Sequence, residues 1–277
     1  MVDSKNRPPG GDGEDGVQAG ADAPAGFPDC WRCPFRLRTA GEVCLACLRS
    51  RTGAGSAGVA ACPVCDQAAP AEGCGNDWCT RADRWFSVLW AIAPNAGAWR
   101  WAIRAYKYRR QTDWAAVFGR ILLGYLDEHM PWFDDFDVLT PMPAFTGPGA
   151  RRDWDHVGDV VAVTRRLAGP RWEFRAGLVV KDRETPALAG LLRPARRRCA
   201  EGPLRQALRV PDPGDVAGRR ILVIDDVFTE GSTLREVARA LRLAGADEVA
   251  GIALARQPWH EPGRPAARPA AAVEAGT

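Results

Sequence analysis

The sequence predicts an α/β protein with a largely parallel sheet, preceded by a small cysteine-rich module. Two segments, ILVIDD at 221–226 and EVAGIAL at 248–254, are apolar without alternation, as is typical of parallel strands buried on both faces. An amphipathic segment at 232–244 lies between them, and strands that alternate with helices predict a parallel sheet. Eight of the nine cysteines lie between residues 30 and 79, which marks a separate module.

Composition divides the 277 residues into four parts. Residues 1–28 are rich in Gly, Pro, Asp and Ala and contain little to bury, so we expect a disordered tail. Residues 258–277 have a similar bias and are expected to be a second disordered tail. Between the tails, residues 29–80 hold the cysteine module, and residues 81–257 hold the α/β domain with a helical connector at its start.

Charge and hydropathy exclude several classes of protein. The net charge of +3 is too small to identify nucleic acid or a membrane as the partner. No apolar run approaches the roughly 18 residues of a membrane-spanning helix, and the N-terminus lacks the apolar core of a secretory signal. We therefore expect a soluble, cytoplasmic protein with no membrane partner, and we exclude collagen, a coiled coil and a disulfide-rich mini-protein.

The spacing of apolar residues and the positions of prolines predict the other helices and strands of the α/β domain. Asp113 is placed to cap the second of three expected helices, and prolines end the first expected strand. We expect helices over 98–110, 113–129 and 156–168, and short strands over 137–143 and 177–180.

The cysteines of the module form four close pairs, which is typical of two structural zinc sites with four thiolates each. In so small a module the metal would supply most of the folding energy. Disulfides are the alternative, but a cytosolic location disfavours them. The eight expected zinc ligands are Cys30, Cys33, Cys44, Cys47, Cys62, Cys65, Cys74 and Cys79.

Two pairings of these cysteines remain open. In the sequential pairing, the first four share one ion and the last four share the other. In the cross-braced pairing, the second and third pairs are exchanged. The loops inside each half are shorter than the gap between the halves, which favours the sequential pairing.

The strongest chemical signal is ILVIDDVFTEGSTL at 221–234, where a buried strand ends in Asp225 and Asp226. Ligands bind at the carboxyl ends of parallel strands. Two adjacent carboxylates can accept hydrogen bonds from neighbouring sugar hydroxyls. Without a ligand, two like charges side by side repel and stabilise little.

The loop that follows the acids has features of a phosphate site. Backbone N–H groups at a helix N-terminus suit a phosphate, and Gly231 would let the backbone approach it without a Cβ clash. Ser232 or Thr233 could cap the helix and also donate to the phosphate.

This stretch resembles the phosphoribosyl-pyrophosphate (PRPP) motif of type I phosphoribosyltransferases, which has two acids, two apolar residues and Thr-Thr-Gly-x-Thr. Residues 30–257 resemble the ComF-like family, in which a zinc-ribbon region precedes a phosphoribosyltransferase domain. Supporting matches are Tyr-Lys-Tyr at 106–108, Pro-Met-Pro at 141–143, two arginines at 151–152 and LRLAGADEVAGIALAR at 241–256. The resemblance implies a type I phosphoribosyltransferase-like parallel sheet with helices on both faces, after a small double zinc-ribbon module.

The resemblance also implies roles for named residues. Asp225 and Asp226 would be catalytic and would hold the ribose hydroxyls of PRPP, while Mg²⁺ would bridge these hydroxyls and the pyrophosphate. Arg151 and Arg152 would face the pyrophosphate, and Lys107 could reach a phosphate from the first helix. The loop residues expected to bind PRPP, or a ribose-phosphate nucleotide, are Val227, Phe228, Thr229, Glu230, Gly231, Ser232 and Thr233.

The sequence departs from the family pattern in three places, one of which is Asp-Trp-Asp-His at 153–156 where family members usually have an Arg-Gly-Phe-Asn-Gln-like stretch. Glu230 stands where the motif has its second Thr, and Leu188 stands where Gln usually follows Thr185 by three residues. The intact acid pair favours an enzyme that exchanges the pyrophosphate of PRPP for an unidentified acceptor. The departures favour a non-catalytic accessory protein of DNA uptake that binds single-stranded DNA or a DNA-processing protein.

Two further features keep alternatives open. Segment 81–110 carries seven basic residues interleaved with aromatic ones, which suits single-stranded DNA, or else forms an amphipathic helix with solvated arginines. His156 could act as a general acid or base, although a lone histidine is more often structural.

Overall fold

The computed structural model describes residues 48, 61–68, 73–188 and 190–258. At its centre lies a four-stranded sheet in the order β1-β6-β5-β2, with every neighbouring pair parallel. The strands are β1 (Leu89–Pro94), β2 (Val138–Pro141), β5 (Arg220–Phe228) and β6 (Glu248–Arg256). A separate antiparallel pair is formed by β3 (Val180–Lys181) and β4 (Leu208–Arg209).

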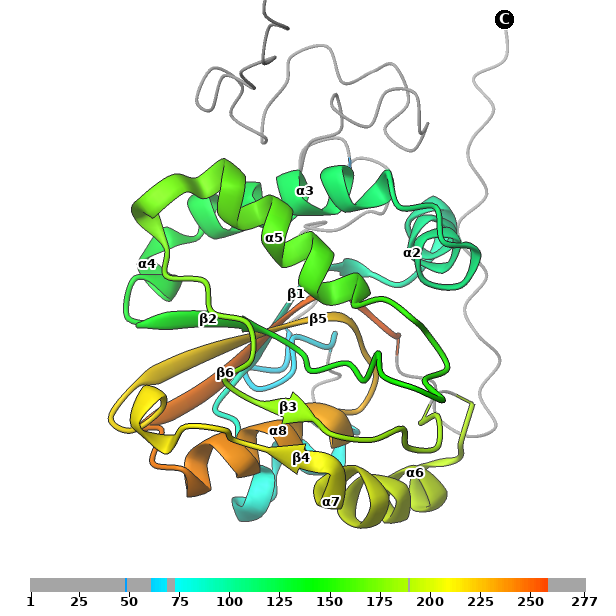
Figure 1. Ribbon diagram of the computed structural model, residues 1–277, viewed down its shortest axis with the longest axis vertical. Coiled ribbons are helices and arrows are strands. Elements are labelled where there is room, and N and C mark those ends of the chain that lie inside the picture. Colours follow the sequence, from blue (N-terminus) through cyan, green and yellow to red (C-terminus); the bar gives the residue numbers. More distant parts are fainter. Residues whose placement is uncertain (1–47, 49–60, 69–72, 189, 259–277) are drawn as a thin grey trace, which may run out of the picture.

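Helices cover both faces of the sheet (Figure 1). One face carries α2 (Gly97–Arg109), α3 (Trp114–Glu128), α4 (Met130–Phe133) and α5 (His156–Ala168). The other carries α6 (Arg193–Cys199), α7 (Arg205–Ala207) and α8 (Ser232–Leu243), and a π-helical turn at Ala200–Leu204 joins α6 to α7. The expected α/β fold, with a parallel sheet between two helical layers, is confirmed.

Burial explains why β5 and β6 lack alternation. Ile221 to Ile224 are each at most 1% exposed, because helices pack on both faces of the sheet. On β6, a Cβ added at Gly251 would lie 2.7 Å from a Leu234 methyl and 2.9 Å from a Leu89 methyl. Gly251 therefore lets α8 pack closely on the strand.

The structure corrects four details of the expected elements. The first strand of the sheet, β1, lies where we expected the start of a helical connector, because a short apolar run does not distinguish a strand from a helix. β5 continues through the two acids as far as Phe228, and the strand expected at 177–180 begins only at Val180. Asp113 stands at the N-cap of α3, but its side chain makes no capping hydrogen bond.

Part of the expected organisation at both ends of the chain lies outside the described residues. This holds for the tail at 1–28, for nearly all of the tail at 258–277, and for Cys30, Cys33, Cys44 and Cys47. In the described part of the module, Cys62 and Cys65 are buried in one apolar cluster with Phe86 and Phe228 of the α/β domain. The module and the domain therefore share a core. In the described ranges, no helix has the length and apolar character needed to cross a membrane.

Candidate functional site

The acid pair lies near the carboxyl end of β5, a strand flanked by β6 and β2. Asp226 is 6% exposed and accepts from two side chains on the helical layer above. Its Oδ2 contacts Lys107 Nζ on α2 and lies 3.1 Å from Nε2 of His156, the first residue of α5. Burial alone would raise the pKa of Asp226, but the Lys107 charge and the His156 hydrogen bond outweigh it and hold this pKa well below its ordinary value.

The neighbouring acid has the opposite electrostatics. Asp225 Oδ1 accepts from the Asp226 backbone N at 2.8 Å. Burial, and then the negative charge of Asp226, raise the pKa of Asp225 to about 7. Both acids line a small cavity with Tyr106 and His156. The pair therefore combines one carboxylate that stays ionised with one that titrates near neutrality.

The helical layer fixes His156 through several contacts. Asp155 caps α5 by accepting from the Gly158 backbone N at 2.8 Å, and Tyr106 Oη donates to the His156 carbonyl at 2.7 Å. The Trp154 and Tyr106 rings meet edge to face, with their centroids 4.8 Å apart. These contacts hold His156 in place beside Asp226, a partner that the sequence did not reveal.

The β5–α8 loop (residues 229–231) makes the turn from the strand into α8. Gly231 has a φ of +104°, and a Cβ there would lie 2.9 Å from the Phe228 ring, so the turn requires glycine. Gly231 is itself the N-cap, and no side chain caps the helix. Ser232 Oγ instead donates to Glu230 Oε1 at 2.6 Å. The Glu230 side chain is buried, and its Oε2 has no partner among the described residues.

Of the other residues expected to bind the ligand, one lies at the acid pair and two do not. Lys107 contacts Asp226 and is therefore part of the acid-pair site. Arg151 donates its backbone N to Glu184 Oε2 and its Nη2 to the Thr185 carbonyl, each at 3.0 Å. Arg152 Nη1 is buried and has no partner in the described chain. Neither arginine forms a hydrogen bond or ion pair with the acid pair in the described ranges.

Four cysteines of the module form the cysteine cluster (Cys62, Cys65, Cys74 and Cys79), whose sulfurs all lie within 4.8 Å of one another. The Cys65–Cys74 and Cys74–Cys79 sulfur distances are 3.6 and 3.7 Å. A zinc ion bound to four thiolates sets sulfur distances of roughly 3.8 Å. The cluster therefore fits a tetrahedral zinc ion, and its membership is that of the sequential pairing. A hydrogen bond from Cys79 and, against the effect of burial, the charge of Arg256 lower the pKa of Cys65 to about 5.

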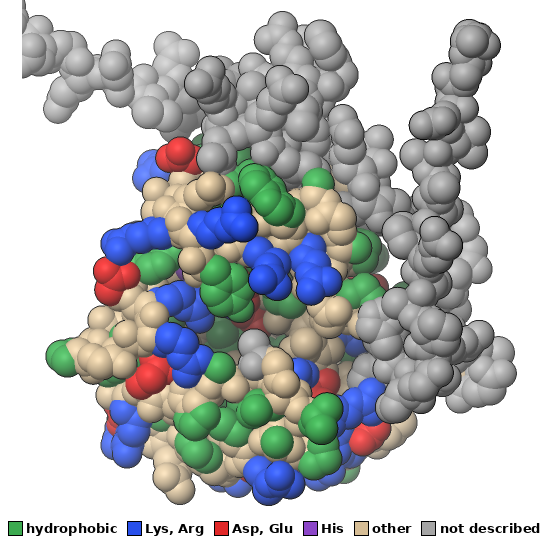
Figure 2. Space-filling model, turned by 90° about the vertical axis from the view of Figure 1, so that its right-hand side faces the viewer, with side chains coloured by type: hydrophobic (Ala, Val, Ile, Leu, Met, Phe, Trp, Pro, Cys, Tyr) green, Lys and Arg blue, Asp and Glu red, His purple; other side chains and the backbone are tan. Residues whose placement is uncertain are grey.

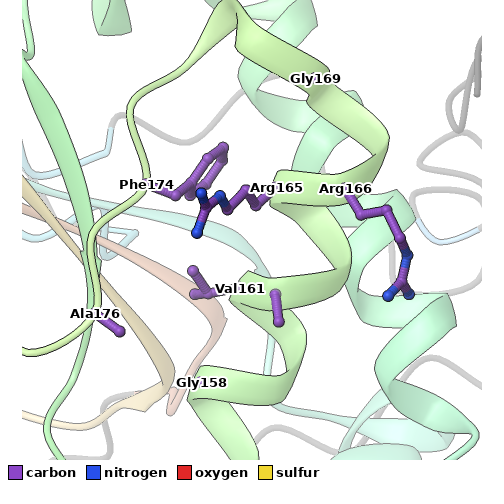
Figure 3. A pocket seen from close by; sticks show the side chains of 8 residues that line it. Gly158, Val161, Arg165, Arg166, Gly169, Phe174 and Ala176 are labelled. Carbon is purple, nitrogen blue, oxygen red and sulfur yellow. The ribbon is translucent and has the colours of Figure 1, made fainter.

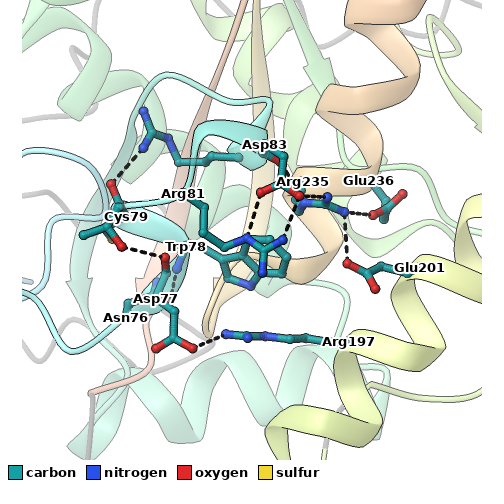
Figure 4. A network of polar contacts seen from close by, with 12 residues as sticks. Asn76, Asp77, Trp78, Cys79, Arg81, Asp83, Arg197, Glu201, Arg235 and Glu236 are labelled. Atoms are coloured by element: carbon teal, nitrogen blue, oxygen red, sulfur yellow. Dashed lines mark hydrogen bonds and ion pairs between the residues drawn. The ribbon is translucent and has the colours of Figure 1, made fainter.

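A stack of arginines holds the module against α6 and α8 (Figure 4). Trp78 is 1% exposed, and the guanidinium groups of Arg81, Arg197 and Arg235 lie 4.6, 4.8 and 4.6 Å from its ring centroid. Arg235 Nη2 also donates to Asp83 Oδ2 at 2.6 Å. The cation–π contacts of Arg197 and Arg235 with Trp78 therefore join the module to the domain.

A second, larger pocket lies along α5, away from the acid pair, with a volume of about 540 Å³ (Figure 3). Gly158, Val161 and Arg165 of α5 line it on one side, and Phe174 and Ala176 line it on the other. Arg166 also lines this pocket, and it leaves α5 on a different side from Arg165. It contains none of the expected site residues.

Comparisons with known proteins agree with this architecture. Residues 186–264, which include the acid pair and the β5–α8 loop, match the family model described as the phosphoribosyl transferase domain. The chain is 25% identical over 228 residues to the DNA utilization protein YhgH of Salmonella typhimurium, and the alignment covers 79% of this chain and 93% of that protein. The resemblance to the ComF-like family is confirmed.

Two shorter matches are to phosphoribosyltransferases. An orotate phosphoribosyltransferase of a Nocardioides species is 50% identical over 48 residues, which are 17% of this chain and 27% of that enzyme. An adenine phosphoribosyltransferase of Mycobacteroides abscessus is 48% identical over 50 residues, or 17% and 28%. The chain thus matches little more than a quarter of each enzyme. Among solved structures, the allosteric regulatory enzyme of purine biosynthesis aligns with a TM-score of 0.34 and 23% identity, over 55% of this chain and 30% of that one.

Proposed function

We propose that the protein binds PRPP at the carboxyl end of β5 and transfers or senses its phosphoribosyl group, with an acceptor still to be identified. The observation that carries the proposal is the acid pair itself. Asp225 and Asp226 lie near the end of β5, a few residues before the glycine turn into α8, and Lys107 and His156 hold the second acid in place.

The ribose would be bound by the acids. The Lys107 charge and the His156 hydrogen bond keep Asp226 ionised and oriented, so it can accept from a hydroxyl without first being organised by the ligand. Asp225 accepts best above its pKa of about 7, where it is ionised. Two carboxylates near the ribose would also stabilise the positive charge that develops on the sugar as its bond to pyrophosphate breaks.

The 5′-phosphate would be bound by backbone. The N–H groups at the start of α8 have no side-chain cap, so they are free of competition from the chain's own hydroxyls. The Glu230 carboxylate is buried and accepts from Ser232 Oγ, so it does not occupy the surface of the loop.

The pyrophosphate side of the site is less complete than the ribose side. Arg152 has a buried Nη1 without a partner in the described chain, which suits a phosphate oxygen. Mg²⁺, when it binds together with PRPP, would neutralise part of the pyrophosphate charge and assist its departure. The residues of the chain would bind and orient the two ends of the ligand.

Calorimetric titration of the zinc-loaded protein with PRPP and Mg²⁺ tests the proposal. We expect saturable binding by the wild type, none by Asp225→Asn/Asp226→Asn, and unchanged binding by Asp153→Asn. Asp153 is a matched control because its ion pair with Arg110 is exposed, with 61% and 71% of the side chains accessible. A wild type that does not bind PRPP would contradict the proposal.

A second candidate function, the binding of single-stranded DNA, is favoured by the outer face of α2. Trp101 and Tyr108 are 47% and 62% exposed there, and Arg104 lies 5.9 Å from the Tyr108 ring. Figure 2 shows this side of the molecule, where basic and hydrophobic side chains lie together. Stacking aromatics combined with arginines suit the bases and phosphates of a single strand.

Salt dependence tests this second candidate. If α2 binds DNA, affinity falls steeply as salt rises, and Trp101→Ala/Tyr108→Ala weakens binding about tenfold or more. Trp132→Ala is the control, because Trp132 is also exposed, at 51%, but lies on α4. Binding that ignores salt, or that responds equally to both variants, would count against an α2 site.

A further inference from the structure

Two carbonyl groups of the β5–α8 loop accept hydrogen bonds from residues far away in the sequence. Arg256, at the end of β6, donates from Nη1 to the Thr229 carbonyl at 2.6 Å. Asn76, in the cysteine module, donates from Nδ2 to the Glu230 carbonyl at 2.9 Å. Arg256 and Asn76 are 4% and 1% exposed, so water does not replace these bonds.

Arg256 links the loop to a cysteine of the cluster. Its Nη2 lies 3.4 Å from Cys65 Sγ, and its guanidinium lies 4.8 Å from the centroid of the Phe228 ring. The Arg256 charge acts on Cys65 and on the partly buried Asp66 carboxylate, and the Cys65 sulfur is the cysteine atom that Arg256 contacts directly. Arg256 therefore bridges the cluster and the loop, with one guanidinium nitrogen on the Cys65 sulfur and the other on the Thr229 carbonyl.

Asn76, inside the module, also links the cysteine cluster to the β5–α8 loop. Its backbone N donates to Cys74 Sγ at 3.5 Å, and its Oδ1 accepts from the Trp78 backbone N at 3.3 Å. Its remaining side-chain donor goes to Glu230. One residue therefore contacts a thiolate, the turn that leads to Cys79, and the loop, as groups surrounding a metal site commonly do.

We infer that the cysteine cluster is a working part of the ligand site, and that Arg256 and Asn76 are positioning residues that transmit its geometry to the β5–α8 loop. A zinc ion would fix the relative positions of the four sulfurs, and with them the positions of Arg256 beside Cys65 and of Asn76 beside Cys74. Loss of zinc, or oxidation of the thiolates, releases both donors and frees the Thr229 and Glu230 carbonyls. The inference deepens the proposed function, since the loop it orders is the proposed phosphate site.

The link has a reciprocal consequence. If zinc orders the loop and PRPP binds the ordered loop, then PRPP must raise the affinity for zinc by the same factor. The cluster would then sense zinc supply or oxidation and report it to the phosphate site.

Hydrogen–deuterium exchange tests the link without any ligand. We expect the amides of residues 229–233 to exchange about tenfold faster or more in the zinc-stripped wild type and in zinc-loaded Arg256→Gln. Arg84→Gln is the matched control, because Arg84 also contacts the cluster, through the Cys79 carbonyl at 2.9 Å, but does not touch the loop. We expect no change at 229–233 in this control. Equal exchange with and without zinc would overturn the inference, as would equal effects of the two arginine variants.

A milder variant keeps the test decisive if Arg256→Gln fails to fold. Asn76→Ala removes only one donor to the loop and leaves all four cysteines in place. We expect faster exchange at 229–233, with an unchanged zinc content of the cluster. An Asn76→Ala protein with wild-type exchange in the loop would contradict the role of Asn76.

The reciprocal effect separates this inference from the proposed function. We expect saturating PRPP and Mg²⁺ to slow zinc removal by a chromogenic chelator about fivefold or more in the wild type, and to have no such effect in Arg256→Gln. If the wild type binds PRPP and zinc leaves at the same rate, the link is wrong and the proposed function stands. If the wild type does not bind PRPP, the proposed function fails, and the exchange experiment alone decides the link.

Discussion

The β5–α8 loop and the acid pair before it are held from two sides by different kinds of interaction. Towards α2 and α5, Asp226 is held by the charged Lys107 and by His156. Towards the cysteine module, the loop is held through its carbonyls by Asn76 and Arg256. The first side responds to protonation and charge, and the second responds to the state of four thiolates. The difference shows that the position of one short motif can depend on two separate sets of contacts.

Among the substitutions considered, removal of one cysteine sulfur of the cluster should lower the free energy of unfolding most. We expect Cys65→Ser to lower the zinc content by one ion per chain and the free energy of unfolding by roughly 3 kcal/mol or more, because Cys65 is fully buried and contacts Arg256. Chelator titration and urea unfolding measure the two effects. Cys199→Ser is the control, since Cys199 lies outside the cluster and is partly exposed. Similar losses in both variants would show that the cluster has no special role.

Neutralising Asp226 should disrupt the contacts of the acid pair with α2 and α5 and destabilise the protein. Asp226→Asn leaves Lys107 and His156 without the carboxylate they share, so we expect a loss of roughly 2–4 kcal/mol in the free energy of unfolding at neutral pH. Asp153→Asn, which disrupts an exposed ion pair, should cost less than about 1 kcal/mol. Urea unfolding gives both values. An Asp226→Asn protein as stable as the wild type would contradict the description of this side.

Neutralising Asp225, in contrast, should stabilise the protein. Its pKa is raised to about 7 from 3.8, so the protonated form favours folding. That stability is fully present below pH 3.8 and is lost as pH rises through about 7. We therefore expect Asp225→Asn to stabilise the protein by roughly 1–3 kcal/mol above the pKa and by little at low pH.

The measurement for this prediction is the urea midpoint of the wild type and of Asp225→Asn as a function of pH. The two curves should converge as pH falls from 8 to 5. A stabilisation by Asp225→Asn that does not depend on pH would show that ionisation of Asp225 is not its cause.

Replacement of Glu230 by the threonine of the family motif should have the smallest effect. Glu230→Thr removes a buried negative charge from the loop that would bind the phosphate, and it restores a hydroxyl. We expect PRPP to bind about three- to tenfold more tightly, which corresponds to roughly 1 kcal/mol. Calorimetric titration beside the wild type checks this, and weaker binding would show that the buried carboxylate supports the loop.

The sequence predicts the acid pair because all of its signals are local. The apolar run of β5, the adjacent acids and Gly231 before α8 lie within 14 residues, and burial and backbone geometry confirm how they are arranged. The cysteine spacing likewise predicts the cluster that the structure assembles. Local spacing is sufficient where one strand, one turn or one knuckle forms the feature.

The partners of these features could not be predicted in the same way. Asn76 and Glu230 are 154 positions apart, and Lys107 and Asp226 are 119 positions apart. Such contacts depend on the order of strands in the sheet and on how the module docks, and neither leaves a local pattern. β1 was missed for a related reason, because its short apolar run becomes a strand only through pairing with β6. Arg256 does end the stretch that supports the family resemblance, but nothing in that stretch indicates its link to Cys65.

The central claim is that PRPP binds at the acid pair and the β5–α8 loop, and the most direct test is the exchange footprint of saturating PRPP and Mg²⁺ on the zinc-loaded wild type. The larger pocket along α5 provides the internal comparison. We expect slower exchange at the amides of residues 225–233 and unchanged exchange at 158–176. Protection along α5, or no protection at 225–233, would contradict the claim.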